Sequence, residues 1–117
     1  MPITQFEDIY SWQKSQDLAV DIYKIFKVVH DRSFRDQICR AVVSISNNVA
    51  EGFDLDTNRQ FTRHLYIARG SAAEVRSMLY LAQRLGYITE AQKQDLIPRS
   101  REISRLLRGF IKSIEKK

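Results

Sequence analysis

The amino-acid sequence predicts an all-α protein: one antiparallel, up-down-up-down four-helix bundle spanning residues 1–117. Three observations lead to this fold class. Apolar residues recur every three or four positions in four long segments, a spacing that places them on one face of a helix. Only four Gly and two Pro occur in the 117 residues, so few positions break a helix. The connections between the segments are short, which favours antiparallel neighbours.

The first two helices are expected at about 11–29 and 33–53. The polar run at 30–33 separates them, and Ser33 is placed to cap the second helix, with Asp36 in its first turn. The second helix has two apolar or small faces, which usually means two packing partners. The first face is Phe34, Ile38, Ala41, Val42, Ile45 and Val49, and the second is Cys39, Val43, Ser46, Ala50 and Phe53.

The last two helices are expected at about 57–85 and 89–115. A Thr followed three residues later by Gln opens each of them, which is the pattern of a capping box. These pairs are Thr57 with Gln60 and Thr89 with Gln92. Gly86 should end the third helix in the left-handed conformation. Pro98 has no N–H and its ring clashes with the preceding turn, so we expect the fourth helix to kink or restart there.

The third helix also has a second stripe at helical spacing, besides the one that faces the core. It consists of Ile67, Ser71, Glu74, Met78, Leu81 and Leu85. Gly70 lies beside this stripe, and Gly in a helix interior costs about 1 kcal/mol relative to Ala. We therefore expect a neighbouring helix to approach closely at Gly70. One four-helix core cannot cover the second faces of both helices, and exposed faces of that size usually mark an interface, which predicts a homo-oligomer.

Two stretches of small and polar residues, 45–53 and 68–74, lie inside these otherwise apolar helices. Buried polar side chains are costly unless they find partners. The residues concerned are Asn48, Glu51, Gly52, Gly70, Ser71 and Glu74. One interpretation is a hydrogen-bonded network that sets helix register or a subunit contact, as polar core residues often do. The other is a site between the second and third helices, which binds a ligand or uses its carboxylates for a metal or for proton transfer.

Positive charge is concentrated in the last quarter of the chain. Residues 92–117 hold eight Lys or Arg and three Asp or Glu, and this excess equals the net charge of +5 of the whole chain. Five of the cations fall within an arc of about 80° on one helix face. This basic ridge consists of Arg101, Arg105, Arg108, Lys112 and Lys116. It is either a solvated outer face or a surface that contacts the phosphates of RNA or DNA. No aromatic residue is interleaved with it, so the ridge offers no platform for base stacking, and any binding should be electrostatic and weakly sequence-specific.

Patterns that carry catalysis are missing from the sequence. We find no phosphate-binding Gly-rich loop, zinc-ligand spacing or nucleophile elbow, and we expect no catalysis, cofactor or metal. Cys39 is expected to be a small buried residue, and the isolated His64 to be exposed or to cap a helix. No apolar run is long enough to span a membrane, and the first residues do not resemble a secretory signal. A single cysteine favours a reducing compartment, so we expect a cytoplasmic protein.

Both polar stretches resemble signatures of the proteins encoded by 23S rRNA intervening sequences. Residues 44–53 read Ser-Ile-Ser-Asn-Asn-Val-Ala-Glu-Gly-Phe and resemble that family's Ser-Ile-x-x-Asn-Ile-Ala-Glu-Gly element. Residues 67–71 read Ile-Ala-Arg-Gly-Ser, and with Glu74 they resemble its Ile-Ala-x-Gly-Ser-x-x-Glu element. The segments 12–14 and 85–88 also fit, so the resemblance covers nearly the whole chain.

The resemblance implies a bacterial cytoplasmic four-helix bundle that assembles into a ring-shaped homo-oligomer, a pentamer. The accessory variability determinant of diversity-generating retroelements is similar; it is a basic pentameric barrel that binds nucleic acid and a reverse transcriptase. Charge and resemblance together favour a non-catalytic nucleic-acid-binding or scaffolding protein. The alternative is an oligomeric bundle that binds a protein partner or small ligand through the region of Asn48, Glu51 and Glu74.

Overall fold

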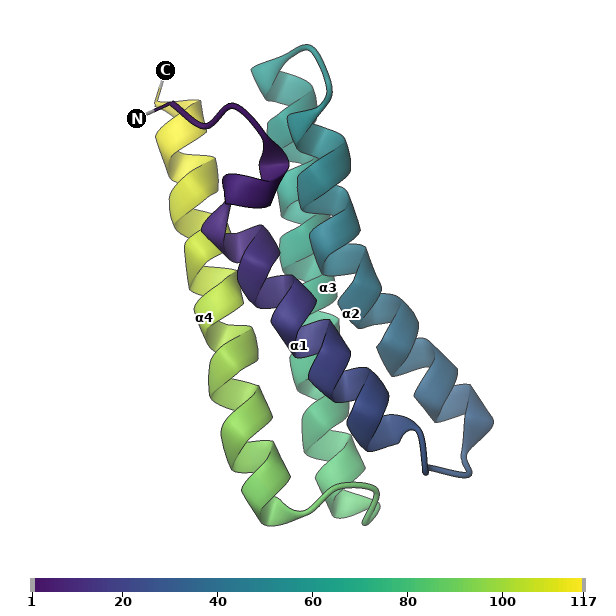
Figure 1. The fold of residues 1–117 in the computed structure, drawn as a ribbon. Coiled ribbons are helices and arrows are strands. Elements are labelled where there is room, and N and C mark those ends of the chain that lie inside the picture. The colour runs from purple at the N-terminus through teal and green to yellow at the C-terminus, as the bar shows by residue number, and fades with distance from the viewer. Residues whose placement is uncertain (1, 117) are drawn as a thin grey trace.

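The computed structural model describes residues 2–116 and contains four long helices, as the sequence predicts. These are α1 (Tyr10–Phe26), α2 (Arg32–Phe53), α3 (Asn58–Arg84) and α4 (Glu90–Glu115), preceded by one short 3-10 turn, η1 (Phe6–Asp8). The bundle measures 45 × 22 × 19 Å. Successive helices run in opposite directions, so α1 begins and α4 ends at the same end of the molecule (Figure 1). Between residues 2 and 116, no helix is both long and apolar enough to cross a membrane.

Helices that are neighbours in the sequence pack most extensively in space. α2 and α3 share the largest contact, followed by α3 and α4 and then by α1 and α2, while α1 and α4 close the bundle with the smallest. α1 has 17 residues against 27 in α3 and 26 in α4, so it covers only part of their length (Figure 1). One salt bridge crosses this last seam, from Arg99 of α4 to Asp21 of α1, at 2.8 Å.

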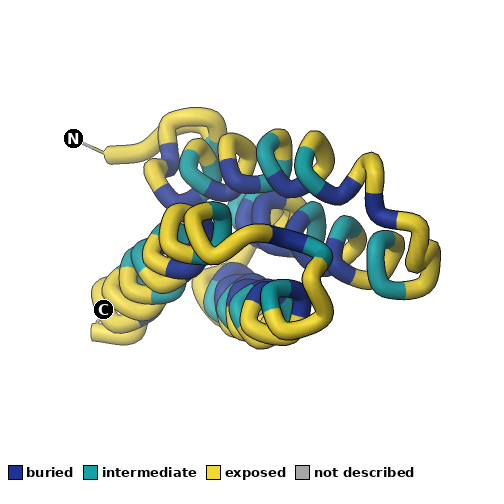
Figure 2. Tube along the Cα trace, turned by 90° about the horizontal axis from the view of Figure 1, so that it is seen from below, coloured by how far each residue is buried: buried dark blue, intermediate teal, exposed yellow. Residues whose placement is uncertain are grey.

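The core consists of the first apolar stripe of each helix. The predicted stripe of α3 is buried at every position, and that of α2 at every position except the half-buried Phe34. Buried positions face the inside of the bundle along all four helices, and exposed positions face out (Figure 2). Full burial of one Leu, Ile, Val or Phe side chain contributes about 1.5–3 kcal/mol, so this interior supplies the main stabilisation of the fold.

The capping residues differ in part from those expected. Asp31, and not Ser33, caps α2: its carboxylate accepts a hydrogen bond from the amide of Phe34 at 3.1 Å. α2 therefore starts two residues earlier than a cap at Ser33 allows, and Asp36 falls outside its first turn. A hydrogen bond of 2.7 Å from the Tyr87 hydroxyl to Asp31 also ties this cap to the connection between α3 and α4.

The two predicted capping boxes differ from each other. The box at the start of α4 is complete, because Thr89 accepts from the amide of Gln92 and the Gln92 side chain accepts from the amide of Thr89. At the start of α3, only one of the two hydrogen bonds of a capping box forms. Thr57 accepts from the amide of Gln60, but the Gln60 side chain accepts from the Thr57 hydroxyl instead of its amide.

Gly86 ends α3 as predicted, with φ of 79°. Two hydrogen bonds close the turn, from the Tyr87 amide to the Ala82 carbonyl at 2.8 Å and from the Gly86 amide to the Gln83 carbonyl at 3.1 Å; together they form a Schellman motif. The expectation that α4 restarts at Pro98 is wrong, since α4 continues through it. Pro98 lies on the exposed side, where water can bond the carbonyl that loses its N–H donor.

Close helix approach occurs at Gly52, not at Gly70. A Cβ added to Gly52 would lie 2.6 Å from Cβ of His64 and 3.1 Å from Cδ1 of Phe61, so α2 and α3 meet there with no room for a side chain. A Cβ added to Gly70 would meet nothing within 4 Å. The expectation of a close approach at Gly70 is therefore wrong within this chain, because Gly70 lies on the outer side of α3.

Candidate nucleic-acid interface

Five arginines from two helices surround one groove on the outside of the bundle. The groove has a volume of about 330 Å³ and runs between α3 and α4. Its lining is Arg69, Ala73 and Arg76 from α3, with Arg101, Ser104, Arg105 and Arg108 from α4. We call it the arginine groove. Three of its arginines belong to the basic ridge predicted from the sequence, whereas Arg69 and Arg76 were not predicted as site residues.

Helix geometry explains why these residues meet. Arg69 and Arg76 are seven residues apart, which corresponds to about two turns of α3. Both lie next to the buried stripe of α3, on the side nearer to α4. Arg101, Arg105 and Arg108 occupy the same side of three successive turns of α4. Because α3 and α4 are antiparallel and packed together, these two rows face each other across the outer edge of their contact.

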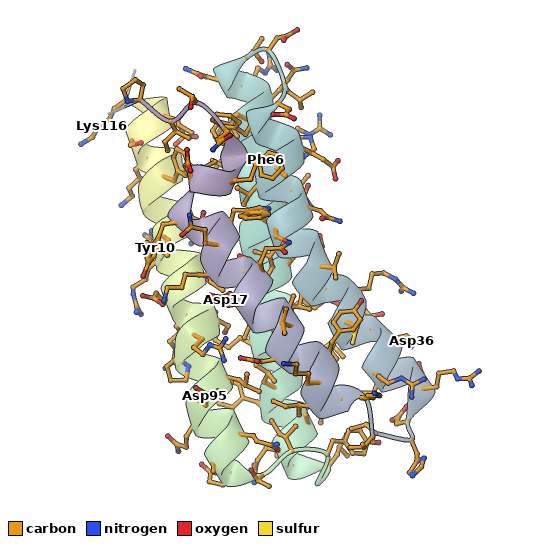
Figure 3. All side chains as sticks on the ribbon, viewed as in Figure 1. Phe6, Tyr10, Asp17, Asp36, Asp95 and Lys116 are labelled. Atoms are coloured by element: carbon orange, nitrogen blue, oxygen red, sulfur yellow. The ribbon has the colours of Figure 1, made fainter. Side chains whose placement is uncertain are left out.

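Lys112 and Lys116 of the basic ridge lie beyond the groove. Lys112 is exposed in the last turn of α4, and the exposed Lys116 is the C-cap of that helix and projects from the end of the bundle (Figure 3). Neither lines the groove. The structure therefore divides the basic ridge into two parts. Arg101, Arg105 and Arg108 line the groove together with α3, and Lys112 and Lys116 lie outside it.

In the part of the chain that the structure describes, no acidic side chain lines the arginine groove. Among the residues that the structure describes, none of the five groove arginines has a carboxylate within 4.0 Å. On α4, Asp95 pairs with Arg99, and Glu102 lines the seam towards α1 together with Lys14 and Asp17. Within residues 2–116, the groove arginines are therefore not paired with a carboxylate at salt-bridge distance.

Two tyrosines of α3 lie about one turn beyond the groove arginines of that helix, Tyr66 before Arg69 and Tyr80 after Arg76. Tyr66 lines a neighbouring hollow with Ile114 and Glu115. The Tyr80 hydroxyl accepts a hydrogen bond of 3.0 Å from Arg101, and the Tyr66 hydroxyl donates one of 3.2 Å to Glu115. Tyr66 is 49% exposed and Tyr80 41%. The sequence of α4 alone contains no interleaved aromatic residue, but α3 supplies two beside the same arginines.

Some groove side chains are held in place before any ligand binds. Arg76 donates to the Ser104 hydroxyl at 3.3 Å, which links α3 to α4 across the groove. Partial burial, and then the hydrogen bond to Glu115, raise the pKa of Tyr66, so its phenol keeps the proton that it donates. Such contacts reduce the conformational freedom that the side chains would otherwise lose on binding.

The polar residues between α2 and α3 form a hydrogen-bonded seam. Asn48 donates to the Ser44 carbonyl at 2.9 Å and to the Ser44 hydroxyl at 3.0 Å, and the Ser44 and Ser71 hydroxyls are 2.9 Å apart. The side-chain oxygen of Asn48 lies 2.9 Å from Nδ1 of His64. Since that oxygen can only accept, Nδ1 of His64 carries the proton. His64 is part of this seam, which corrects the expectation of an exposed or capping histidine.

The two carboxylates expected at this seam do not take part in it. Glu51 is exposed near the end of α2. Glu74 of α3 accepts a hydrogen bond from Gln37, which lies near the start of α2. Glu51 and Gln37 are 14 residues apart, or about 21 Å along a helix. The structure therefore does not bring Asn48, Glu51 and Glu74 into one site, and no group of three or more metal-ligating side chains occurs within residues 2–116.

A larger hollow, about 670 Å³, lies between α1 and α2 and is more apolar in character. Its lining includes Tyr23, Cys39 and Val43. Cys39 is half-buried there, and burial raises the pKa of its thiol, which lowers its reactivity as a nucleophile. Lys27, Arg35 and Arg40 also line this hollow together with Asp36, which forms a salt bridge with Arg35.

Comparisons with known proteins agree with this fold. The family model described as 23S rRNA-intervening sequence protein matches residues 7–109. A crystal structure of a protein with unknown function from the S23 ribosomal protein family of Bacteroides thetaiotaomicron is similar, with a TM-score of 0.81 and 31% sequence identity over 87% of this chain and 95% of that one. No curated protein matches the sequence. The family match covers most of the bundle, including both polar stretches, and the chain therefore belongs to the 23S rRNA-intervening sequence protein family.

Proposed function

We propose that this protein is a non-catalytic nucleic-acid-binding protein that contacts phosphates through the arginine groove. One observation carries the proposal: five arginines from two helices converge on a single groove, and none of them has an acidic partner within 4.0 Å among residues 2–116. Lys112 and Lys116 would extend the contact along α4.

The chemistry of guanidinium groups suits a phosphate backbone. Arginine is always charged at neutral pH and forms bidentate hydrogen bonds with phosphate oxygens. Five like charges around a groove of about 330 Å³ repel one another, and a polyanion would relieve that repulsion while releasing its own counterions. Contacts of this kind read the backbone and not the base edges, so we expect little sequence specificity.

The family resemblance agrees with this proposal in part. Nucleic-acid binding by a basic bundle would fit the expected similarity to the accessory variability determinant of diversity-generating retroelements, which stays a prediction. It would also fit a role in the bacterial cytoplasm, where RNA and DNA are available. A scaffolding role is compatible with the same surface, because a bound strand could bring other proteins to the bundle.

The test compares two triple variants with wild type, using fluorescence anisotropy with labelled RNA and DNA at low salt. The first variant replaces Arg101, Arg105 and Arg108 by Gln, which keeps helix propensity and length. The control replaces Lys24, Arg32 and Arg40 by Gln, which removes the same charge from the exposed faces of α1 and α2. We expect the groove variant to bind much more weakly and the control to bind nearly as wild type does. Equal losses in both variants would assign binding to net charge alone.

We also propose that the chain forms a homo-oligomer, with the pentamer as the assembly that the family resemblance implies. The supporting observation is the second stripe of α3, where Ile67 is 45%, Leu81 46% and Leu85 50% exposed in the single chain. Water-exposed apolar side chains aligned on one helix face favour burial against another copy. A ring would repeat the arginine groove once in each subunit, and one long strand could then contact several grooves.

A further inference from the structure

We infer that the arginine groove is built for single-stranded nucleic acid, with Tyr66 and Tyr80 as stacking surfaces for unpaired bases. This inference rests on the proposed nucleic-acid binding and specifies the form of its ligand. The observation behind it is the order of residues along one side of α3: an exposed tyrosine, the two groove arginines and a second exposed tyrosine.

The spacing along α3 suits a short strand. Tyr66 and Tyr80 are 14 residues apart, which corresponds to about 21 Å along the helix axis and to a rotation of only about 40°. Arg69 and Arg76 lie between them. Ala73, at the midpoint, contributes a small side chain to the groove lining. A strand lying in the groove would meet a ring at each end and guanidinium groups in between.

Both tyrosines are held by their hydroxyl groups while their rings remain about half exposed. The Oη atoms bond to residues of α4, Glu115 for Tyr66 and Arg101 for Tyr80. The side chains are thereby oriented by their polar ends, and much of each ring is left for contact. Fixed aromatic rings beside a basic groove are the arrangement on which successive unpaired bases stack.

Lys93 occupies one face of the Tyr80 ring in the absence of ligand. Its Nζ lies 5.6 Å from the ring centroid and 3.4 Å from a carboxylate oxygen of Glu90. An exposed cation–π contact is weaker than the stacking of a base on an aromatic ring. A base would therefore displace Lys93, whose ammonium group would stay close enough to contact the neighbouring phosphate.

Duplexes cannot use the tyrosines in this way. Paired bases are already stacked on one another and present only their edges in the grooves, so a duplex would engage the arginines without the rings. The arginines should therefore bind both forms, while the tyrosines favour the single strand. RNA and DNA single strands both present base faces, and both are tested.

The experiment measures the affinity of a single-stranded oligonucleotide, its duplex and an abasic strand of equal length, by anisotropy, in RNA and DNA versions. For wild type we expect the single strand to bind about tenfold or more tightly than the abasic strand, which has the same phosphates but no bases. Replacing Tyr66 and Tyr80 by Leu should weaken single-strand binding by about the same factor and change duplex affinity by less than about twofold.

Two further variants separate stacking from structure. Replacing both tyrosines by Phe keeps the rings but removes the hydroxyl groups that orient them, so it should weaken single-strand binding much less than the Leu variant does. Tyr23→Leu removes an equally exposed ring, 50% exposed, from α1 and should have no effect. Equal wild-type affinity for the abasic and normal strands, or equal losses for duplex and single strand in the Leu variant, would overturn this inference alone. No binding of any strand would overturn the proposed function and this inference together.

Discussion

At the residue scale, the close distance between α2 and α3 depends on Gly52, which has no side chain. Gly52 is buried against His64 and Phe61, and a Cβ there would lie 2.6 Å from Cβ of His64. Neither partner atom can move freely, because one is the first carbon of a helical side chain and the other belongs to a packed ring. Gly70, on the same pair of helices, has open space around it. Replacing the two glycines by Ala is therefore expected to change the stability of the fold in opposite directions.

Gly52→Ala should destabilise the fold by about 1–3 kcal/mol, because the added methyl group overpacks the contact between α2 and α3. Gly70→Ala should instead stabilise it by about 0.5–1 kcal/mol, since Ala in a helix loses less backbone entropy than Gly. Urea unfolding of both variants measures the two free energies. Equal effects of the same sign would contradict the packing described at Gly52.

Asp31 should make stability depend on pH in the acid range. The hydrogen bond from Tyr87, and then that from the Phe34 amide, lower its pKa below the usual 3.8. The Asp31 carboxyl therefore takes up a proton at a higher pH in the unfolded chain than in the folded one. The stabilisation that it provides is complete above the unfolded pKa and is lost as pH falls through the folded pKa. Asp31→Asn cannot titrate at this position.

The measurement is urea unfolding of wild type and Asp31→Asn at about pH 6 and about pH 3. Wild type should lose more stability between these two conditions than the variant does, and the gap between the two proteins should narrow at the lower pH. Asp56→Asn, a change in the exposed loop between α2 and α3, serves as the control. Parallel pH profiles for wild type and Asp31→Asn would show that the Tyr87 contact does not persist in solution.

At the element scale, the α2–α3 seam shows what polar core residues do in this bundle. Asn48 is the centre of the seam, because it bonds both Ser44 on its own helix and His64 on the next. The Ser44–Ser71 contact provides a second bridge between the same two helices. A shift of either helix along its axis would break both bridges and leave polar groups buried without partners. The seam therefore favours a single register of α2 against α3.

Asn48→Ala should cost about 1–3 kcal/mol, because it leaves His64 and Ser44 without their partner in a half-buried place. Asn47→Ala, at the exposed neighbouring position, should change stability by less than about 0.5 kcal/mol. Thermal and urea unfolding give both values. If the two variants were equally stable, the seam would not contribute to the α2–α3 contact.

The four helices could be predicted from the sequence more accurately than the contacts between residues of different helices. Apolar spacing placed all four helices within three residues of their observed ends, because the periodicity of a helix is a local property. The aromatic partners of the basic ridge were missed for the opposite reason. Tyr66 and Tyr80 lie at least 20 residues before Arg101 in the sequence, and only the packing of α3 against α4 brings them into contact with residues of α4. Likewise, Glu51 and Glu74 belong to the two polar stretches of the sequence, but Glu51 lies near the end of α2 and Glu74 contacts Gln37 near the start of α2.

At the scale of the whole molecule, the apolar stripe of α3 and the arginine groove lie on different sides of the same helix. Ile67, Leu81 and Leu85 face away from the core, whereas Arg69 and Arg76 face α4. Subunits could therefore associate through the stripe and leave every groove open. This separation of surfaces allows an oligomer to bind nucleic acid without dissociating.

Replacing both Leu81 and Leu85 by Lys should shift the protein towards monomers, because it places two charges in the proposed subunit contact. Light scattering at micromolar concentration measures the mass, and wild type should give a multiple of the monomer value. Val28→Lys, at a position that is 77% exposed beyond the end of α1, should not change the assembly. A monomeric wild type would exclude the homo-oligomer.

The arginine groove as a phosphate-binding surface is tested most directly by the salt dependence of single-strand binding. Each phosphate contact releases counterions, so the slope of log affinity against log salt counts those contacts, at about −0.7 for each on a single strand. Replacing Arg101, Arg105 and Arg108 by Gln should make the slope shallower by about 2 for each groove engaged, with the fold and the oligomer unchanged. The same slope for wild type and the variant would mean that these arginines do not contact phosphates, and it would contradict the proposed function.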